Sequence, residues 1–130
     1  MKILLAEDDY LTRKAMDNFL SQYGECDVTV NGMEAVDAFM LALEEEEPYD
    51  LVCLDIMMPV MDGYQALMGI RNLEKERHIP VEKSAKIIMT TALNEEKNVK
   101  MALELGCTIY SGKPIDQGRF EQALKKLGLI

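Results

Sequence analysis

Five polar side chains of this 130-residue chain are of the types that phosphoryl transfer needs. Glu7, Asp8 and Asp55 are carboxylates, Thr91 carries a hydroxyl and Lys113 an ammonium group. An aspartate can act as a covalent nucleophile toward a phosphoryl group. Negative charge on the phosphoryl oxygens must then be neutralised, and a metal ion, a lysine and a hydroxyl donor can each take one oxygen. This chemistry requires all five residues to lie in one place.

The three carboxylates would repel one another if they came together. Such a cluster raises its own pKa values unless a cation neutralises it. Oxygen-only ligands of high charge suit a hard divalent ion, and Mg²⁺ is usually bound by one or two carboxylates with waters and phosphate oxygens. No His or Cys stands beside Asp8 or Asp55, which counts against zinc or copper. These two residues therefore predict a Mg²⁺ site, whereas Asp9 is interpreted as the cap of the following helix.

Short apolar runs alternate with longer amphipathic segments along the chain. The runs predict strands at residues 3–6, 26–30, 49–54, 86–90 and 108–110. Helical spacing of apolar residues predicts helices at 11–20, 35–43, 64–77, 94–105 and 117–127, with Asn31-Gly32 as a turn, Asn94 as a helix cap and 78–85 as a loop. Alternating strands and helices predict an α/β fold, a (βα)5 three-layer sandwich with a parallel five-stranded sheet.

The candidate residues fall where the predicted strands end. Glu7 and Asp8 follow the first strand, Asp55 the third, Thr91 the fourth and Lys113 the fifth. In an open parallel sheet, ligands bind outside the carboxyl ends of the strands. A flavodoxin-like strand order, 2-1-3-4-5, makes the first and third strands neighbours, so the three carboxylates are expected to converge in one cleft.

Composition limits the classes of partner and the cellular location. The net charge of −9 repels nucleic acid and anionic lipid, so neither is an expected partner. Three cysteines without a CxxC pair argue against a disulfide framework or a zinc site. The chain lacks a signal peptide and an apolar stretch near the roughly 18 residues that span a bilayer, which predicts a cytoplasmic protein. Residues 1–130 are predicted to form one domain, with any output domain outside the chain.

The sequence resembles the CheY-like receiver domains of two-component response regulators. The resemblance runs over the whole chain and rests on the segments ILLAEDD, DIMMPVMDG, IIMTTA, ALELGCTIY and SGKPI, in that order. It implies that Asp55 is the phosphoacceptor, Glu7 and Asp8 the acidic pair, Thr91 the switch hydroxyl and Lys113 the family's lysine. Residues 74–86 form a longer segment than is usual, which predicts an extended third helix or loop.

The resemblance also implies how a metal is held. Asp8, Asp55 and the backbone carbonyl of Met57 would ligate Mg²⁺ directly, and Glu7 would act through a water molecule. Glu7 stands where many members of the family have Asp, although Glu is a common variant there.

A switch and its partners follow from the same resemblance. Tyr110 corresponds to the aromatic residue that turns inward when the Thr91 hydroxyl moves to the phosphate, and Lys113-Pro114 to a cis peptide bond. The donor would be a sensor histidine kinase or a histidine phosphotransfer protein, and the chain a monomer or a phosphorylation-dependent dimer. It would catalyse only its own phosphotransfer and dephosphorylation, so it is not expected to be an enzyme. The fourth helix, fifth strand and last helix would form the partner surface, to which we assign Asn94, Lys97, Lys100, Met101, Tyr110 and Arg119.

Three alternatives are less well supported. A haloacid-dehalogenase-like phosphatase needs a second Asp two residues after its nucleophile, where this chain has Met57. A flavodoxin-like FMN carrier needs a Ser/Thr/Gly-rich phosphate loop after the first strand, and the Glu-Asp-Asp found here would repel phosphate without a metal. A receiver that no longer accepts phosphate is disfavoured by the intact set of Asp8, Asp55, Thr91 and Lys113.

Overall fold

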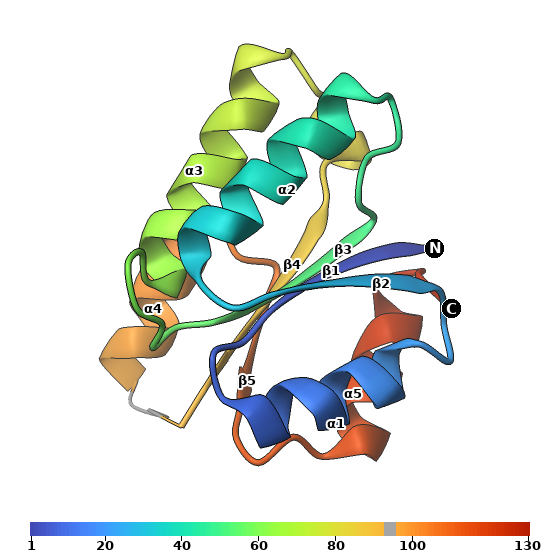
Figure 1. Cartoon of the computed structure of the whole chain (residues 1–130), viewed down its shortest axis with the longest axis vertical. Helices are drawn as coiled ribbons and strands as arrows, with labels where there is room; N and C mark the ends of the chain where they lie inside the picture. Colours follow the sequence, from blue (N-terminus) through green and yellow to red (C-terminus); the bar gives the residue numbers. More distant parts are fainter. Residues whose placement is uncertain (93–95) are drawn as a thin grey trace.

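A single parallel sheet organises the protein, as predicted. The computed structural model describes residues 1–92 and 96–130, so the predicted helix cap at Asn94 lies outside the described residues. The sheet has the strand order β2-β1-β3-β4-β5, which confirms the predicted order 2-1-3-4-5 (Figure 1). Its strands are β1 (Lys2–Ala6), β2 (Glu25–Thr29), β3 (Leu51–Asp55), β4 (Lys86–Thr91) and β5 (Ile109–Gly112).

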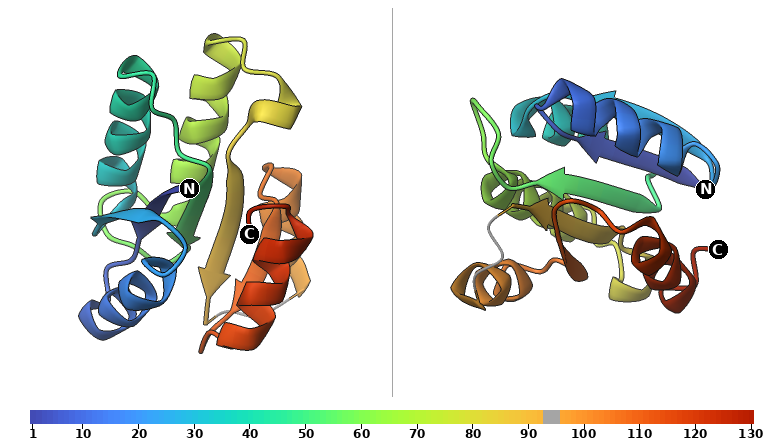
Figure 2. Two further views of the ribbon diagram at one scale, coloured as in Figure 1. Left: turned by 90° about the vertical axis from the view of Figure 1, so that its right-hand side faces the viewer. Right: turned by 90° about the horizontal axis from the view of Figure 1, so that it is seen from below.

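Helices cover both faces of the sheet and complete the three layers. One face carries α1 (Tyr10–Leu20) and α5 (Gln117–Lys126), and the other carries α2 (Gly32–Glu44), α3 (Gly63–Glu76) and α4 (Glu96–Glu104) (Figure 1). The turned views show the same layers and place the two termini close together, at the end of the sheet where β1 begins (Figure 2). The carboxyl edge, where the candidate residues follow the strands, lies at the opposite end.

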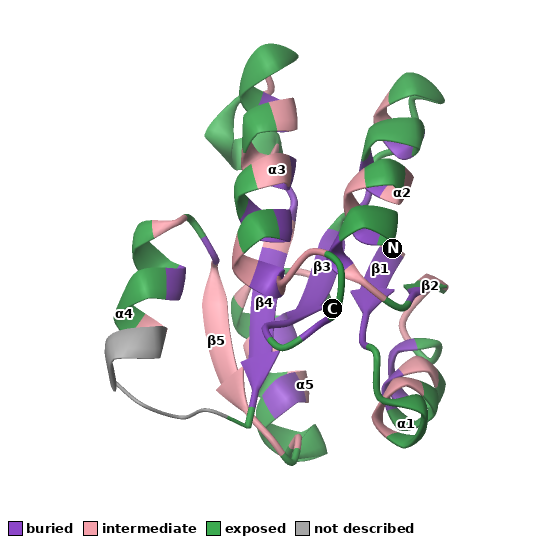
Figure 3. Ribbon diagram, turned by 60° about the vertical axis from the view of Figure 1, so that its left-hand side comes forward, coloured by how far each residue is buried: buried purple, intermediate pink, exposed green. Residues whose placement is uncertain are grey.

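Each face of the sheet has its own hydrophobic core. Along β3, Leu51 and Cys53 join the core under α1 and α5, whereas Val52 and Leu54 join the core under α2, α3 and α4. This alternation explains why a central strand appears in the sequence as an unbroken apolar run. Figure 3 shows β3 and β4 as buried and the edge strand β5 as only partly buried.

Short polar side chains fix where the helices begin. Each accepts a hydrogen bond from the backbone N–H three residues further on, which satisfies a donor that the helix itself leaves unpaired. The caps are Asp9 for α1, Asn31 for α2, Asp62 for α3 and Asp116 for α5. The capping role predicted for Asp9 is confirmed, but Asn31-Gly32 starts α2 instead of forming a separate turn.

Several predicted boundaries move by one or two residues. The third strand begins at Leu51 rather than at residue 49, because pairing with β1 starts where Ile3 meets Leu51. Tyr49 lies before that point, where it is buried and its hydroxyl donates a 2.6 Å hydrogen bond to Asp27 Oδ2. The predicted loop at 78–85 contains a short 3-10 helix at Val81–Lys83.

A buried ion pair anchors the long connection between α3 and β4. Glu74 is 5% exposed, and Arg71 Nη1 lies 2.7 Å from its Oε1. The other carboxylate oxygen of Glu74 accepts a hydrogen bond from Ala85 N, and Arg71 donates to the carbonyl oxygens of Ala85 and Gly106. The pair thus ties α3 to the start of β4 and to the turn after α4.

We expect Glu74→Ala to lower the free energy of unfolding by about 3 kcal/mol, because it leaves Arg71 and the Ala85 amide without their buried partner. Urea unfolding followed by circular dichroism measures this difference. Glu76→Ala is the matched control, since Glu76 is an exposed residue at the end of the same helix, and its effect is expected to stay within about 0.5 kcal/mol. Equal losses in the two variants would contradict the anchoring role.

Candidate functional site

The carboxyl ends of β1 and β3 bring three carboxylates together. These strands are neighbours, with Ala6 paired to Leu54, so the residues that follow them meet at one edge. Glu7, Asp8 and Asp55 each place an oxygen within 4.8 Å of the other two. Glu7 and Asp55 are buried, whereas Asp8 is exposed. The convergence expected from the sequence is therefore present.

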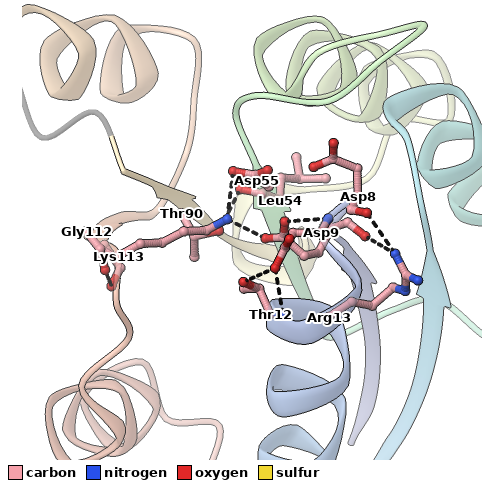
Figure 4. Close-up of polar contacts among 11 residues, drawn as sticks. Asp8, Asp9, Thr12, Arg13, Leu54, Asp55, Thr90, Gly112 and Lys113 are labelled. Carbon is pink, nitrogen blue, oxygen red and sulfur yellow. Dashed lines mark hydrogen bonds and ion pairs between the residues drawn. The ribbon is translucent and has the colours of Figure 1, made fainter.

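Lys113, the residue directly after β5, contacts two of these carboxylates. Its Nζ lies 3.2 Å from Asp55 Oδ1 and 2.5 Å from Glu7 Oε2 (Figure 4). Its backbone N donates a 2.8 Å hydrogen bond to the carbonyl of Thr91, which fixes the chain beyond β5 against the end of β4. The Lys113-Pro114 peptide bond is cis, as the resemblance implied.

The mutual arrangement of these charges shifts their pKa values. Burial raises the pKa of Asp55 to about 6, and the negative charge of Glu7 adds to the rise while Lys113 opposes it. Burial alone would lower the pKa of Lys113, but its hydrogen bond to Glu7 and the charge of Asp55 hold it above the ordinary value. The site therefore keeps its ammonium charged and carries more negative charge than one lysine neutralises.

Glu7 makes a direct contact that sequence reasoning missed. Its Oε2 pairs with Lys113, while its Oε1 accepts a 3.1 Å hydrogen bond from Asp9 N. Because the contact with Lys113 joins residues 106 positions apart, no local pattern indicates it.

The hydroxyl and aromatic residues lie on the next two strands. Asp55 pairs with Thr90, so Thr91 lies one residue closer to the edge, where it is fully buried. Alternation along β4 places Thr91 on the same face as Met89, whose neighbour in β5 is Tyr110. Tyr110 packs against the core under α2, α3 and α4. Thr91 and Tyr110 therefore face the same layer of helices.

The loop after Asp55 passes very close to the start of α3. A Cβ atom on Gly63 would lie 2.3 Å from the carbonyl oxygen of Asp55, so only glycine fits there. Gly63 N also donates a 2.9 Å hydrogen bond to Ile56 O. Met57 is 63% exposed and Met58 is buried. This close approach of the two backbones explains why the motif after Asp55 ends in a glycine, Gly63.

Arg13 is a second residue that sequence reasoning missed. Its Nη1 donates hydrogen bonds to the carbonyl oxygens of Glu7, at 3.0 Å, and Asp8, at 3.1 Å (Figure 4). The available signal was an arginine in the second turn of the helix that follows two adjacent acids. Such a side chain is long enough to fold back over the loop between them.

The donor atoms of the cluster fit a hard divalent cation. All three ligating side chains offer carboxylate oxygens, and no nitrogen or sulfur ligand belongs to the group. Cys26, Cys53 and Cys107 are free thiols, as predicted. Within residues 1–92 and 96–130, no helix has the length and apolar character needed to cross a membrane.

A groove opens beside the cluster. It has a volume of about 570 Å³ and runs between α1 and the segment that follows β5. One end reaches Lys113 and Ala92, and apolar side chains of α1, including Leu11 and Met16, form its wall. Lys113 is thus shared by the groove and by the ion pairs with Glu7 and Asp55.

Known proteins resemble this chain over almost its whole length. A family model described as the response regulator receiver domain matches residues 3–125. The chain is 33% identical over 126 residues to the "Probable transcriptional regulator ycf29" of Porphyra purpurea, covering 96% of this chain and 55% of that protein. It is 33% identical to "Probable histidine kinase 2" of Oryza sativa subsp. indica, covering 95% of this chain but only 12% of the kinase. It is 32% identical to "Chemotaxis protein CheY" of Treponema pallidum, covering 89% of this chain and 74% of that protein.

Two solved structures that contain receiver-type chains have folds similar to that of this chain. The CheX–CheY–BeF3–Mg²⁺ complex from Borrelia burgdorferi contains a chain with a TM-score of 0.84 and 28% identity, covering 98% of this chain and 89% of that one. The complex of the Saccharomyces cerevisiae histidine phosphotransfer protein Ypd1 with the receiver domain of Ssk1 gives a TM-score of 0.83 and 25% identity, with 98% and 88% covered.

The raised pKa of Asp55 predicts a pH-dependent effect of its neutral substitute. Asp55→Asn should increase the free energy of unfolding at pH 7 in metal-free buffer by about 1–3 kcal/mol, since one pKa unit is worth about 1.4 kcal/mol. Protonation of Asp55 favours the folded state, because its pKa of about 6 exceeds the ordinary 3.8. This contribution is full below about pH 4 and is lost as the pH rises through about 6, so the advantage of Asn should shrink as the pH falls.

Urea unfolding at several pH values between 4 and 8 measures this difference. Asp37→Asn, at an exposed position on α2, is the control and is expected to change stability by less than about 0.5 kcal/mol at every pH. A stability difference between wild type and Asp55→Asn that does not vary with pH would contradict the assigned cause.

Proposed function

The chain belongs to the response regulator receiver domain family, and from this premise we propose that Asp55 is the phosphoacceptor of a phosphorylation-dependent signalling switch. The observation that carries the proposal is the contact of Asp55 with Lys113 inside the acidic cluster at the carboxyl edge of the sheet. A buried carboxylate next to an ammonium group and an open groove suits a nucleophile that must receive a charged group. The acceptor of the phosphoryl group is then a side chain of the protein itself, and the donor is the only other reactant.

In the proposed reaction, a carboxylate oxygen of Asp55 attacks the phosphorus of a phosphohistidine. An oxygen–phosphorus bond forms while the phosphorus–nitrogen bond breaks, and the imidazole nitrogen recovers the electron pair. Lys113 stabilises the negative charge on the transferred oxygens. A histidine kinase or a histidine phosphotransfer protein is the proposed donor. The likeness to a plant histidine kinase and to a receiver domain crystallised with Ypd1 supports this choice.

Mg²⁺ is the proposed cofactor. Asp8, Asp55 and the backbone carbonyl of Met57 would hold it directly and Glu7 through a water molecule. When bound, the ion would neutralise charge on the phosphoryl oxygens. The purely oxygen donor set supports this assignment, as does the Mg²⁺ named in the Borrelia burgdorferi complex. In the chain itself, Lys113 holds Glu7 and Asp55 together.

We further propose that Thr91 and Tyr110 transmit the change to a partner surface. Phosphorylation adds charge next to Lys113 and offers the Thr91 hydroxyl a new acceptor. Tyr110 faces the same layer of helices as Thr91 and packs, partly buried, against the core under α2, α3 and α4. Movement of Thr91 would therefore repack the surface made by α4, β5 and α5. The acidic chain favours a protein as the downstream partner over nucleic acid.

Intact-mass measurement after incubation with acetyl phosphate tests the acceptor. We expect wild-type protein to gain one phosphoryl group only when Mg²⁺ is present, and Asp55→Asn to gain none. Asp9→Asn is the matched control, because Asp9 is a neighbouring acid whose capping role asparagine can replace. It should be modified as fully as the wild type. Modification of folded Asp55→Asn, or none in the wild type, would reject the assignment.

Amide chemical shifts measured with beryllofluoride and Mg²⁺ test the switch. In the wild type, signals should move both beside Asp55 and along β5. Thr91→Ala should keep the shifts at Ile56, which report occupancy of the site, and lose more than half of those in β5. Thr90→Ala controls for removal of a buried hydroxyl from the adjacent position. Equal responses of β5 in the two variants would remove Thr91 from the switch.

A further inference from the structure

One cationic side chain holds the backbone of two of the three clustered acids. Arg13 lies in the second turn of α1, and its Nη1 bonds both to Glu7 O, at 3.0 Å, and to Asp8 O, at 3.1 Å. Figure 4 shows the guanidinium folded back over the loop that joins β1 to α1. A single group on a helix therefore fixes two successive peptide units of this loop.

The neighbouring contacts leave Asp8 dependent on this arginine. Glu7 is held from other directions, since its N donates to Thr29 O and its carboxylate contacts Lys113 and Asp9 N. Asp8 is exposed, and its hydrogen bond to Arg13 is the one that the structure shows for it among the described residues. Glu7 and Asp9 are held by bonds of their own, so the contact with Arg13 is the hydrogen bond that restrains the Asp8 residue itself.

A restraint of this kind has a physical purpose in a cluster of like charges. Glu7, Asp8 and Asp55 repel one another at separations below 4.8 Å, and the exposed member is the one free to move away. We propose that Arg13 is a positioning residue for the cation site, which keeps Asp8 in the cluster before the cation binds. This inference rests on the proposed Mg²⁺ site and deepens it. A site held in its binding geometry spends less free energy on ordering when its ligand arrives.

The direction in which Mg²⁺ affinity changes when Arg13 is replaced distinguishes this positioning role from a purely electrostatic effect. The positive charge of Arg13 by itself opposes the approach of a cation, so removing that charge alone would strengthen Mg²⁺ binding. Loss of the two carbonyl contacts would instead weaken binding, because Asp8 would be free to leave. Lys14 offers a matched control: its Nζ lies 5.9 Å from the centre of the Tyr10 ring, against 5.6 Å for the Arg13 guanidinium. Removing either cation costs one charge over Tyr10, but only Arg13 contacts the loop carbonyls.

Isothermal titration calorimetry with MgCl2 on the full chain tests the proposal. We expect Arg13→Met to raise the dissociation constant for Mg²⁺ by about 10-fold, the lower end of the roughly 10–100-fold that residues supporting metal ligands contribute. Lys14→Met should bind Mg²⁺ as tightly as the wild type or slightly more tightly. Arg13→Lys, which keeps the charge and a donor, should recover part of the loss. At saturating Mg²⁺, acetyl phosphate should modify Lys14→Met as completely as wild type, whereas Asp55→Asn stays unmodified.

Unchanged or tighter Mg²⁺ binding by Arg13→Met would overturn the positioning role. Equal weakening in Arg13→Met and Lys14→Met would also overturn it, because the effect would then not depend on the carbonyl contacts that only Arg13 makes. If wild-type protein binds no Mg²⁺, the proposed metal site itself fails and the role of Arg13 falls with it. Thermal unfolding in EDTA identifies a variant that is merely unstable. In that case the binding constant of Arg13→Lys, relative to wild type and Lys14→Met, decides the question.

Discussion

Electrostatic repulsion among Glu7, Asp8 and Asp55 is the constraint on which the arrangement of this site depends. The strand order makes β1 and β3 neighbours, so the acids that follow these strands lie side by side at one edge of the sheet. Lys113 crosses from the end of β5 to offset part of the charge. Burial raises the pKa of Asp55, the charge of Glu7 adds to the rise, and Lys113 opposes it. A site with this excess of negative charge is suited to bind a further cation. A transferred group whose oxygens contact both that cation and Lys113 would also fit.

Keeping such a cluster together requires a stiff backbone, and the neighbouring segments provide one. The loop before α1 is held by the Asp9 cap and by Arg13, and the loop before α3 by the capping box of Asp62. Gly63 allows α3 to start against the carbonyl of Asp55. These contacts let the free energy of folding, rather than that of ligand binding, oppose the repulsion.

Membership of the receiver family places the chain in two-component signalling, and backbone contacts join the strand ends around Asp55. The backbone bond from Lys113 to Thr91 joins the ends of β5 and β4 beside Asp55. Thr91 and Tyr110 face one layer of helices. At the other end of the sheet, the pair of Arg71 and Glu74 fixes α3 to the turn after α4.

The sequence by itself determined the strands and the edge of the sheet that carries the site, whereas the order of the strands was taken from the flavodoxin-like fold. Apolar runs such as residues 3–6 identify strands buried on both faces, and parallel strands end at one edge of the sheet. With the flavodoxin-like strand order, these patterns were enough to predict that Asp8 and Asp55 converge. Only the tertiary structure decided that Glu7 pairs with Lys113, that Glu74 is buried, and that Arg13 holds the acidic loop. A single charged residue looks the same in a sequence whether it lies in water or against a distant partner, because its environment is made by side chains that only folding brings together.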